Sequence, residues 1–161
     1  MKILLAVDGS PYTDMVLKEV ASRPWPPGSE VKILGCAHLR IPDIPDPLLI
    51  YYPMRLGLME AERKRMREVV NKSAEMLRLR NTALEIEAEV LDGSPKEVIL
   101  DVAKEWGANL IVVGSHGYGP VKKFLLGSVS QAVASHANCS VEIVRALSTD
   151  SESETTQHEQ V

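Results

Sequence analysis

Short apolar runs alternate along the chain with longer segments that are apolar on one side only. Runs rich in Ile, Val and Leu predict β-strands at residues 2–7, 30–38, 83–91, 109–113 and 140–145. Helix-start signals and apolar residues at helical spacing predict α-helices at residues 11–21, 56–79, 95–106 and 128–137. This alternation predicts an α/β fold, in which parallel strands are joined by right-handed crossovers and helices cover both faces of the sheet.

Serine–proline pairs mark two of the predicted helix starts. Ser10-Pro11 and Ser94-Pro95 each place a capping hydroxyl before a proline, whose missing N–H would have no intrahelical partner at the first helical position. Residues 41–53 are rich in proline and apolar side chains, so we expect no regular helix there. This segment could be a lid over a ligand, a surface for a partner, or ordinary packing against the long helix.

Charge is unevenly distributed along the 161 residues. The formal net charge is −4, and residues 147–161 contain four acids and no Lys or Arg. Without those four acids the acidic and basic residues are equal in number, so the rest of the chain lacks the basic excess typical of nucleic-acid binding. We expect one domain at residues 1–146, a disordered acidic tail at residues 147–161, and no nucleic acid as a partner.

Cysteine content and the length of the apolar runs bear on the compartment. The two cysteines, Cys36 and Cys139, are too few for a disulfide framework. The first apolar run stops at Asp8, which is too short for a signal peptide, and no stretch approaches the ~20 apolar residues that span a membrane. We therefore expect a cytoplasmic protein with no membrane partner.

Two loops that follow predicted strands carry the chemistry of a ligand site. Asp8-Gly9-Ser10 follows the first strand, and glycine-rich residues 114–119 follow the fourth and lead on to residues 127–130 at the next helix start. Ligands of open α/β sheets bind beyond the carboxyl ends of the strands. Glycines at positive φ would let the backbone approach an anion, and the N–H groups of a helix start attract phosphate. The Asp8 carboxylate is suited to accept hydrogen bonds from ribose hydroxyls.

Two common phosphate-binding motifs are absent from the sequence. There is no G-x-x-x-x-G-K-[ST], which excludes a P-loop NTPase, and no G-x-G-x-x-G follows the first strand. The glycine spacing instead matches another signature: Gly114-x-x-Gly117, nine residues, and then Gly127-Ser128 fit the pattern G-2x-G-9x-G-[S/T]. With ILLAVDGS at residues 3–10, GSP at 93–95 and NLIVVGSHG at 109–117, the chain resembles the ATP-binding subgroup of the universal stress protein family over residues 1–146.

The resemblance implies a Rossmann-like fold of the adenine nucleotide alpha hydrolase type, an open five-stranded parallel sheet of order 3-2-1-4-5. It also implies a homodimer joined through the last strand, at residues 141–145, and ATP as the ligand, with Mg²⁺ or Mn²⁺ held mainly by the phosphates. Adenine is expected against Cys36 or Ala37, ribose against Asp8 and Gly114, and phosphates against Gly117, Gly127, Ser128, Val129 and Ser130. The expected site also includes Gly9, Ser10, Val113 and His116.

Structural roles compete with these binding roles. The glycines could serve tight turns alone, and Asp8 or Ser128 could be a helix cap. His116 could be a general base or a phosphate ligand, although a histidine in such a loop is more often structural. Cys36 and His38 could suggest a metal site, but no further ligands follow at a usable spacing.

Three functions are compatible with the sequence. The favoured one is a nucleotide-dependent regulatory or stress-response module. A slow ATPase or autophosphorylating enzyme is the second, although no general base, arginine finger or carboxylate cluster is evident. An interaction protein without nucleotide is the third, and the intact signature counts against it.

Overall fold

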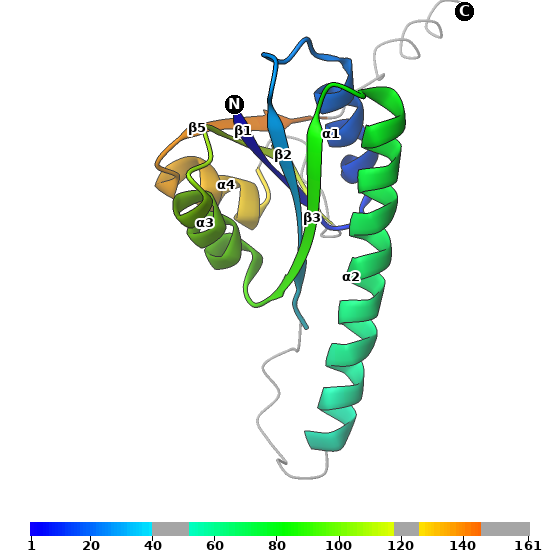
Figure 1. Ribbon diagram of the computed structural model, residues 1–161. Coiled ribbons are helices and arrows are strands. Elements are labelled where there is room, and N and C mark those ends of the chain that lie inside the picture. Colours follow the sequence, from blue (N-terminus) through cyan, green and yellow to red (C-terminus); the bar gives the residue numbers. More distant parts are fainter. Residues whose placement is uncertain (40–51, 118–125, 146–161) are drawn as a thin grey trace, which may run out of the picture.

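The computed structural model describes residues 1–39, 52–117 and 126–145 (Figure 1). Strands and helices alternate along these residues without exception. Their bounds are β1 Lys2–Val7, α1 Pro11–Ser22, β2 Glu30–Ala37, α2 Tyr52–Arg80, β3 Glu85–Asp92, α3 Pro95–Trp106, β4 Leu110–Gly114, α4 Ser128–His136 and β5 Ser140–Val144.

The five strands form one parallel sheet in the order β3-β2-β1-β4-β5, which confirms the predicted fold class. β1 lies at the centre, where its Ile3 is opposite Val31 of β2 and Leu110 of β4. The strand order reverses at β1, because β2 and β3 extend the sheet on one side of β1 and β4 and β5 extend it on the other. The carboxyl end of β1 is therefore the place where a ligand of such a sheet is expected.

Helices cover both faces of the sheet (Figure 1). Ile3 and Leu5 of β1 pack with α1 and α2 on one face, whereas Leu4 packs with α3 and α4 on the other. Because each central strand is buried on both sides, its sequence is a nearly continuous apolar run rather than an alternating one. The charged segments between the strands form helices, since each buries only the apolar stripe that faces the sheet.

The long helix begins earlier than the sequence predicts. α2 starts at Tyr52, so Pro53 lies in its first turn, where a proline breaks no intrahelical hydrogen bond. The prediction of no regular helix over residues 41–53 is therefore wrong for its last two residues. Residues 40–51 and 146–161, which include the proposed lid and the acidic tail, lie outside the described residues.

Gly35 of β2 shows how closely α2 lies on the sheet. A Cβ atom built there would be 2.6 Å from Val70 Cγ2 and 2.7 Å from Met66 Cε. We expect Gly35→Ala to lower the free energy of unfolding by about 1–3 kcal/mol through overpacking. The matched control is Gly57→Ala in the exposed part of α2, where a Cβ meets nothing within 4 Å and where alanine should raise stability by about 1 kcal/mol. Urea denaturation measures both, and equal effects would contradict the expectation.

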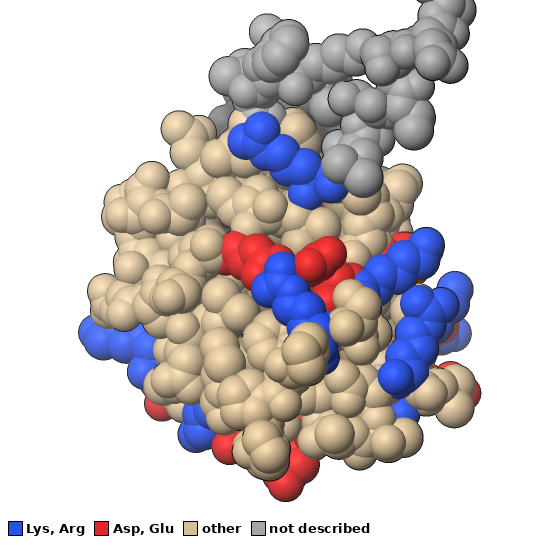
Figure 2. Space-filling view, turned by 90° about the horizontal axis from the view of Figure 1, so that it is seen from above, with Lys and Arg blue, Asp and Glu red and all other residues tan. Residues whose placement is uncertain are grey.

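Acidic and basic side chains lie next to one another on the end of the molecule that carries the N-terminus, and neither sign forms a continuous patch there (Figure 2). One ion-paired group is Arg23 after α1, which contacts Glu19 of α1 at 2.7 Å and Glu142 of β5 at 2.5 Å. Ion pairs of this half-exposed kind add little stability, although this group joins the end of α1 to the edge strand β5.

Candidate functional site

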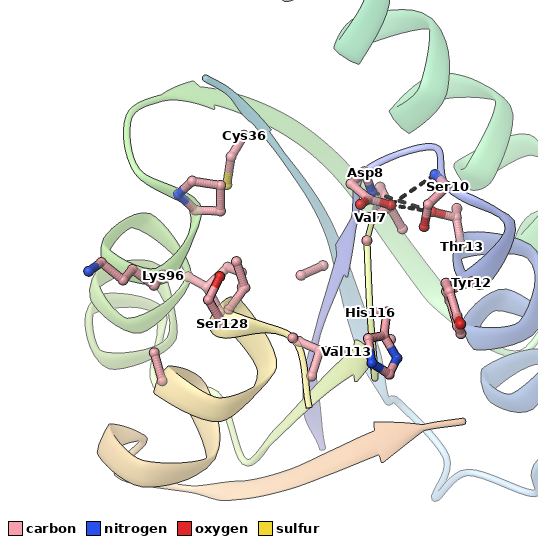
Figure 3. Close-up of a pocket in the computed structure, with 18 of the residues that line it drawn as sticks. Val7, Asp8, Ser10, Tyr12, Thr13, Cys36, Lys96, Val113, His116 and Ser128 are labelled. Carbon is pink, nitrogen blue, oxygen red and sulfur yellow. Dashed lines mark hydrogen bonds between the residues drawn. The ribbon is translucent and has the colours of Figure 1, made fainter. Parts of the chain in front are cut away.

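A cavity of about 670 Å³ lies at the carboxyl ends of the central strands (Figure 3). β1, β2 and β4 end at it, and the N-terminal turns of α1, α3 and α4 border it. In Figure 3, Asp8 and His116 lie on one side of the cavity and Lys96 and Ser128 on the other, with Cys36 toward the top of the view. Helix N-termini present N–H groups without intrahelical partners, so three of them around one cavity favour a negatively charged ligand.

The loop after β1 is held by the Asp8 side chain. Asp8 Oδ1 accepts hydrogen bonds from the Ser10 N–H at 2.9 Å and from Thr13 Oγ1 at 3.3 Å. Thr13 Oγ1 in turn accepts from the N–H groups of Asp8 and Gly9. This Asx-type turn leaves Oδ2 beside Gly117, at the edge of the cavity.

The glycine loop after β4 is fastened to the start of α4 through Ser115. The Ser115 carbonyl accepts from the Gly127 N–H at 2.8 Å and from Ser130 Oγ at 3.0 Å. The Ser115 N–H donates to the Val144 carbonyl of β5 at 2.8 Å. Both ends of the signature therefore meet at one place, although residues 118–125 between them lie outside the described residues.

The signature glycines are required for close approach and not for positive φ. Among the described glycines, those at positive φ are Gly9, Gly28, Gly93 and Gly107. The expectation of positive φ is therefore wrong for Gly114 and Gly117, and Gly119 is not described. A Cβ at Gly114 would instead lie 2.9 Å from Tyr12 Cβ, and one at Gly117 would lie 2.5 Å from Asp8 Oδ2.

Most of the predicted site residues line the cavity: Asp8, Ser10, Cys36, Val113, Gly114, His116, Gly117, Gly127, Ser128 and Val129. The other three predicted residues do not line it. Ala37 is fully buried in the core on the α1–α2 face. Ser130 Oγ donates to the Ser115 and Gly127 carbonyls, so this hydroxyl serves the fold, and Gly9 lies behind Asp8 in the turn.

Several lining residues are not among the predicted site residues: Tyr12, Thr13, His38, Ser94, Pro95 and Lys96. In the sequence, Ser94 and Pro95 indicate a helix start and form part of the family resemblance, but neither predicts a contact with a ligand. The available signal was that this start follows β3 at the same edge of the sheet as the other two loops. Thr13 belongs to no motif in the sequence. Its role is to hold the loop after β1 through hydrogen bonds that exist only in the folded structure.

Two buried polar atoms in the cavity wall have no hydrogen-bond partner among the described residues. These are Ser10 Oγ, in a residue that is only 3% exposed, and His116 Nε2. The capping hydrogen bonds that the two serine–proline pairs predict are absent: the hydroxyls of Ser10 and Ser94 do not cap their helices. A buried polar atom without a partner is unfavourable by about 1–3 kcal/mol, so a ligand with polar groups fits this wall.

Cys36 lies in the apolar part of the same cavity, and burial raises the pKa of its thiol to about 12. At pH 8 the thiol is therefore protonated and should react slowly with iodoacetamide, because the thiolate is the nucleophile. Burial also raises the pKa of the Cys139 thiol, but less than that of Cys36, so we expect Cys139 to be labelled first and Cys36 only on unfolding or as the pH rises toward 12. Peptide mass spectrometry measures both rates, and equal rates at pH 8 would contradict the expectation.

The described residues contain no group of three or more His, Cys, Asp or Glu side chains that could hold a metal ion. Within the same residues, no helix combines the length and the apolar character needed to cross a bilayer.

Comparisons with known proteins place these features in a family context. The model of the universal stress protein family matches residues 1–145. Universal stress protein YxiE of Bacillus subtilis is 30% identical over 147 residues, which covers 89% of this chain and 98% of its own.

Two solved structures share the fold. The hypothetical protein MJ0577 superposes with a TM-score of 0.73 at 26% identity, covering 92% of this chain and 97% of its own. A universal stress protein family protein of Arabidopsis thaliana, solved with AMP bound, superposes with a TM-score of 0.56 at 20% identity, covering 96% and 97%.

Proposed function

The chain belongs to the universal stress protein family, and we propose that it is a member that binds an adenine nucleotide and acts as a nucleotide-dependent regulatory module. The observation that carries the proposal is that three helix N-termini, the Asp8 turn and the glycine loop meet at one cavity. Its volume of about 670 Å³ lies in the range typical of small-ligand sites.

The two halves of the cavity differ in chemistry, as the two halves of a nucleotide do. Leu34 and Cys36 of β2 and Ile99 of α3 line an apolar part, which suits the adenine ring. Gly127, Ser128 and Val129 line the part at the start of α4, where N–H groups and the helix dipole favour phosphate. The AMP seen in the Arabidopsis relative is consistent with this choice of ligand class.

ATP is the nucleotide that we propose, with Asp8 and Gly114 at the ribose and Gly117 at the phosphates. Mg²⁺ or Mn²⁺, where present, would be held mainly by the phosphates, because the described residues offer no cluster of metal ligands. Slow ATP hydrolysis is the second candidate, since His116 lines the cavity that would hold the phosphates and its Nε2 has no hydrogen-bond partner among the described residues.

The assembly and the compartment are further parts of the proposal. β5 is an edge strand that pairs only with β4 in the described sheet, and an exposed edge invites pairing with a second copy. We propose a homodimer joined there. Cys36 and Cys139 are free thiols, which suits the reducing cytoplasm.

The test is to denature freshly purified protein and to identify any released nucleotide by chromatography and mass spectrometry. About one adenine nucleotide per chain, with an ATP-to-ADP ratio stable over hours, supports a regulatory module. Steady conversion to ADP supports the ATPase. No nucleotide, even after incubation with Mg-ATP, would overturn the proposal. Light scattering on the same preparation reports whether the particle has twice the mass of one chain.

A further inference from the structure

A second cavity, called the second lobe below, adjoins the main cavity at Asp8. This lobe has a volume of about 520 Å³ and shares Asp8, Cys36, His38 and Pro95 with the main cavity. Its remaining wall comes from Leu39 and from Glu62, Arg65 and Met66 of α2. The long helix, to which the sequence assigned no binding role, thus borders the site on the side of Asp8.

Arg65 links α2 to the loop after β1. Its Nε and Nη2 donate to the two carboxylate oxygens of Glu62 at 2.8 and 2.7 Å, and its Nη1 donates to the Asp8 backbone carbonyl at 3.2 Å. The fork of the guanidinium is therefore engaged by Glu62, which offsets its charge. The hydrogen bond from Arg65 lowers the pKa of Glu62, so this group is a carboxylate at neutral pH.

Among the described residues, the charged side chains that line the second lobe are two carboxylates and one guanidinium. Asp8 and Glu62 are negative, and Arg65 is positive but paired with Glu62. A neutral group in this lobe meets polar partners, whereas a phosphate meets an excess of negative charge. Like charges at such distances are disfavoured wherever the site is partly shielded from water.

We propose that the second lobe is a ribose-side subsite, in which Glu62 makes the protein select adenine nucleotides with free 2′ and 3′ hydroxyls over those phosphorylated at these positions. The inference rests on the proposed function, because it takes Asp8 as the ribose contact. Because Asp8 lines both lobes, a substituent on the hydroxyls that it contacts is within reach of the lobe that Glu62 and Arg65 border. Glu62 is thus a specificity residue that acts through its charge and through its hold on Arg65.

The test compares the affinities of AMP and adenosine 3′,5′-bisphosphate by calorimetry at pH 8, using the full chain. The natural protein should prefer AMP by about 10-fold or more. Glu62→Gln removes the charge and releases the Arg65 fork, so the preference should disappear or reverse. Glu62→Asp keeps the charge and should keep the preference. The ratio of two affinities does not change with the fraction of folded protein, so a merely structural defect would leave it unaltered.

Glu60→Gln is the matched control. Glu60 lies on the same helix but is exposed, pairs with Arg63 and Arg67, and lines neither lobe. It should leave the preference as it is in the natural protein. An unchanged ratio in Glu62→Gln, an equal change in Glu60→Gln, or no preference in the natural protein would overturn the inference alone. Binding of neither nucleotide to the natural protein would overturn the proposed function and the inference together.

Discussion

Replacing Gly117 with valine should lower the affinity for adenine nucleotides by about 100-fold or more, equivalent to about 2.8 kcal/mol of binding free energy. The reason is local crowding, since even the first side-chain atom at this position would lie 2.5 Å from Asp8 Oδ2. The carboxylate must then turn away, and the bulk of valine fills the space where phosphates are proposed. Isothermal titration with Mg-ATP measures the effect.

The fold should tolerate Gly117→Val, because Gly117 is not among the glycines at positive φ and lies in a loop at the cavity edge. Gly57→Val is the control for the substitution itself, since a Cβ there meets nothing within 4 Å and Gly57 is not among the residues that line either lobe. It should bind as the natural protein does. If Gly117→Val also keeps full affinity, the phosphate role of the glycine loop is wrong.

The fold could be predicted almost completely because its signals are local. Apolar runs such as residues 109–113 are too short and too apolar for surface helices, and a parallel sheet buried on both faces requires them. The sequence predicts a start of α2 that is too late, because the prolines of residues 41–53 indicate a break in the helix. A proline in the first turn removes no intrahelical hydrogen bond, and the sequence alone does not tell that turn from a loop.

The sequence indicates which residues make up most of the candidate site, but not which contacts require glycine there. Glycine spacing predicts that both ends of the signature belong to one site, and Gly114, His116, Gly117 and residues 127–129 line one cavity. It could not indicate why glycine is required, because the atoms that exclude a Cβ belong to Tyr12 and Asp8, about a hundred residues away in the chain. Contacts over such distances exist only in the folded sheet, where β1 and β4 are neighbours.

The contribution of α2 to the site could not be predicted from the sequence for a different reason. Glu62 and Arg65 stand in a helix with dense charge, where a solvated ion pair is the ordinary interpretation. Arg65 contacts the Asp8 carbonyl across 57 residues of sequence, and no motif accompanies that contact. A charged residue near a site is therefore informative only after the cavity is known.

Replacing Asp8 should separate its two roles, which are to hold the loop after β1 and to accept hydrogen bonds from ribose. Asp8→Ala removes both, so we expect nucleotide affinity to fall by about 100-fold and the free energy of unfolding to fall by about 1 kcal/mol. Asp8→Asn keeps an oxygen that can accept from the Ser10 N–H and from Thr13 Oγ1. This variant should keep its stability and lose about 10-fold in affinity, because a charged acceptor binds hydroxyls more strongly than a neutral one.

Titrations with ATP and 2′-deoxy-ATP decide between these roles, together with urea denaturation of each variant. If Asp8 contacts ribose, the natural protein prefers ATP, and Asp8→Asn reduces that preference without loosening the loop. If Asp8 only holds the turn, Asp8→Asn binds both nucleotides as the natural protein does, and Asp8→Ala weakens both equally. The second pattern would show that the ribose does not bind at this end of β1. The loss of affinity in Gly117→Val would then come only from the valine side chain blocking the phosphates. Displacing the Asp8 carboxylate would not weaken binding, because that carboxylate would not contact the nucleotide.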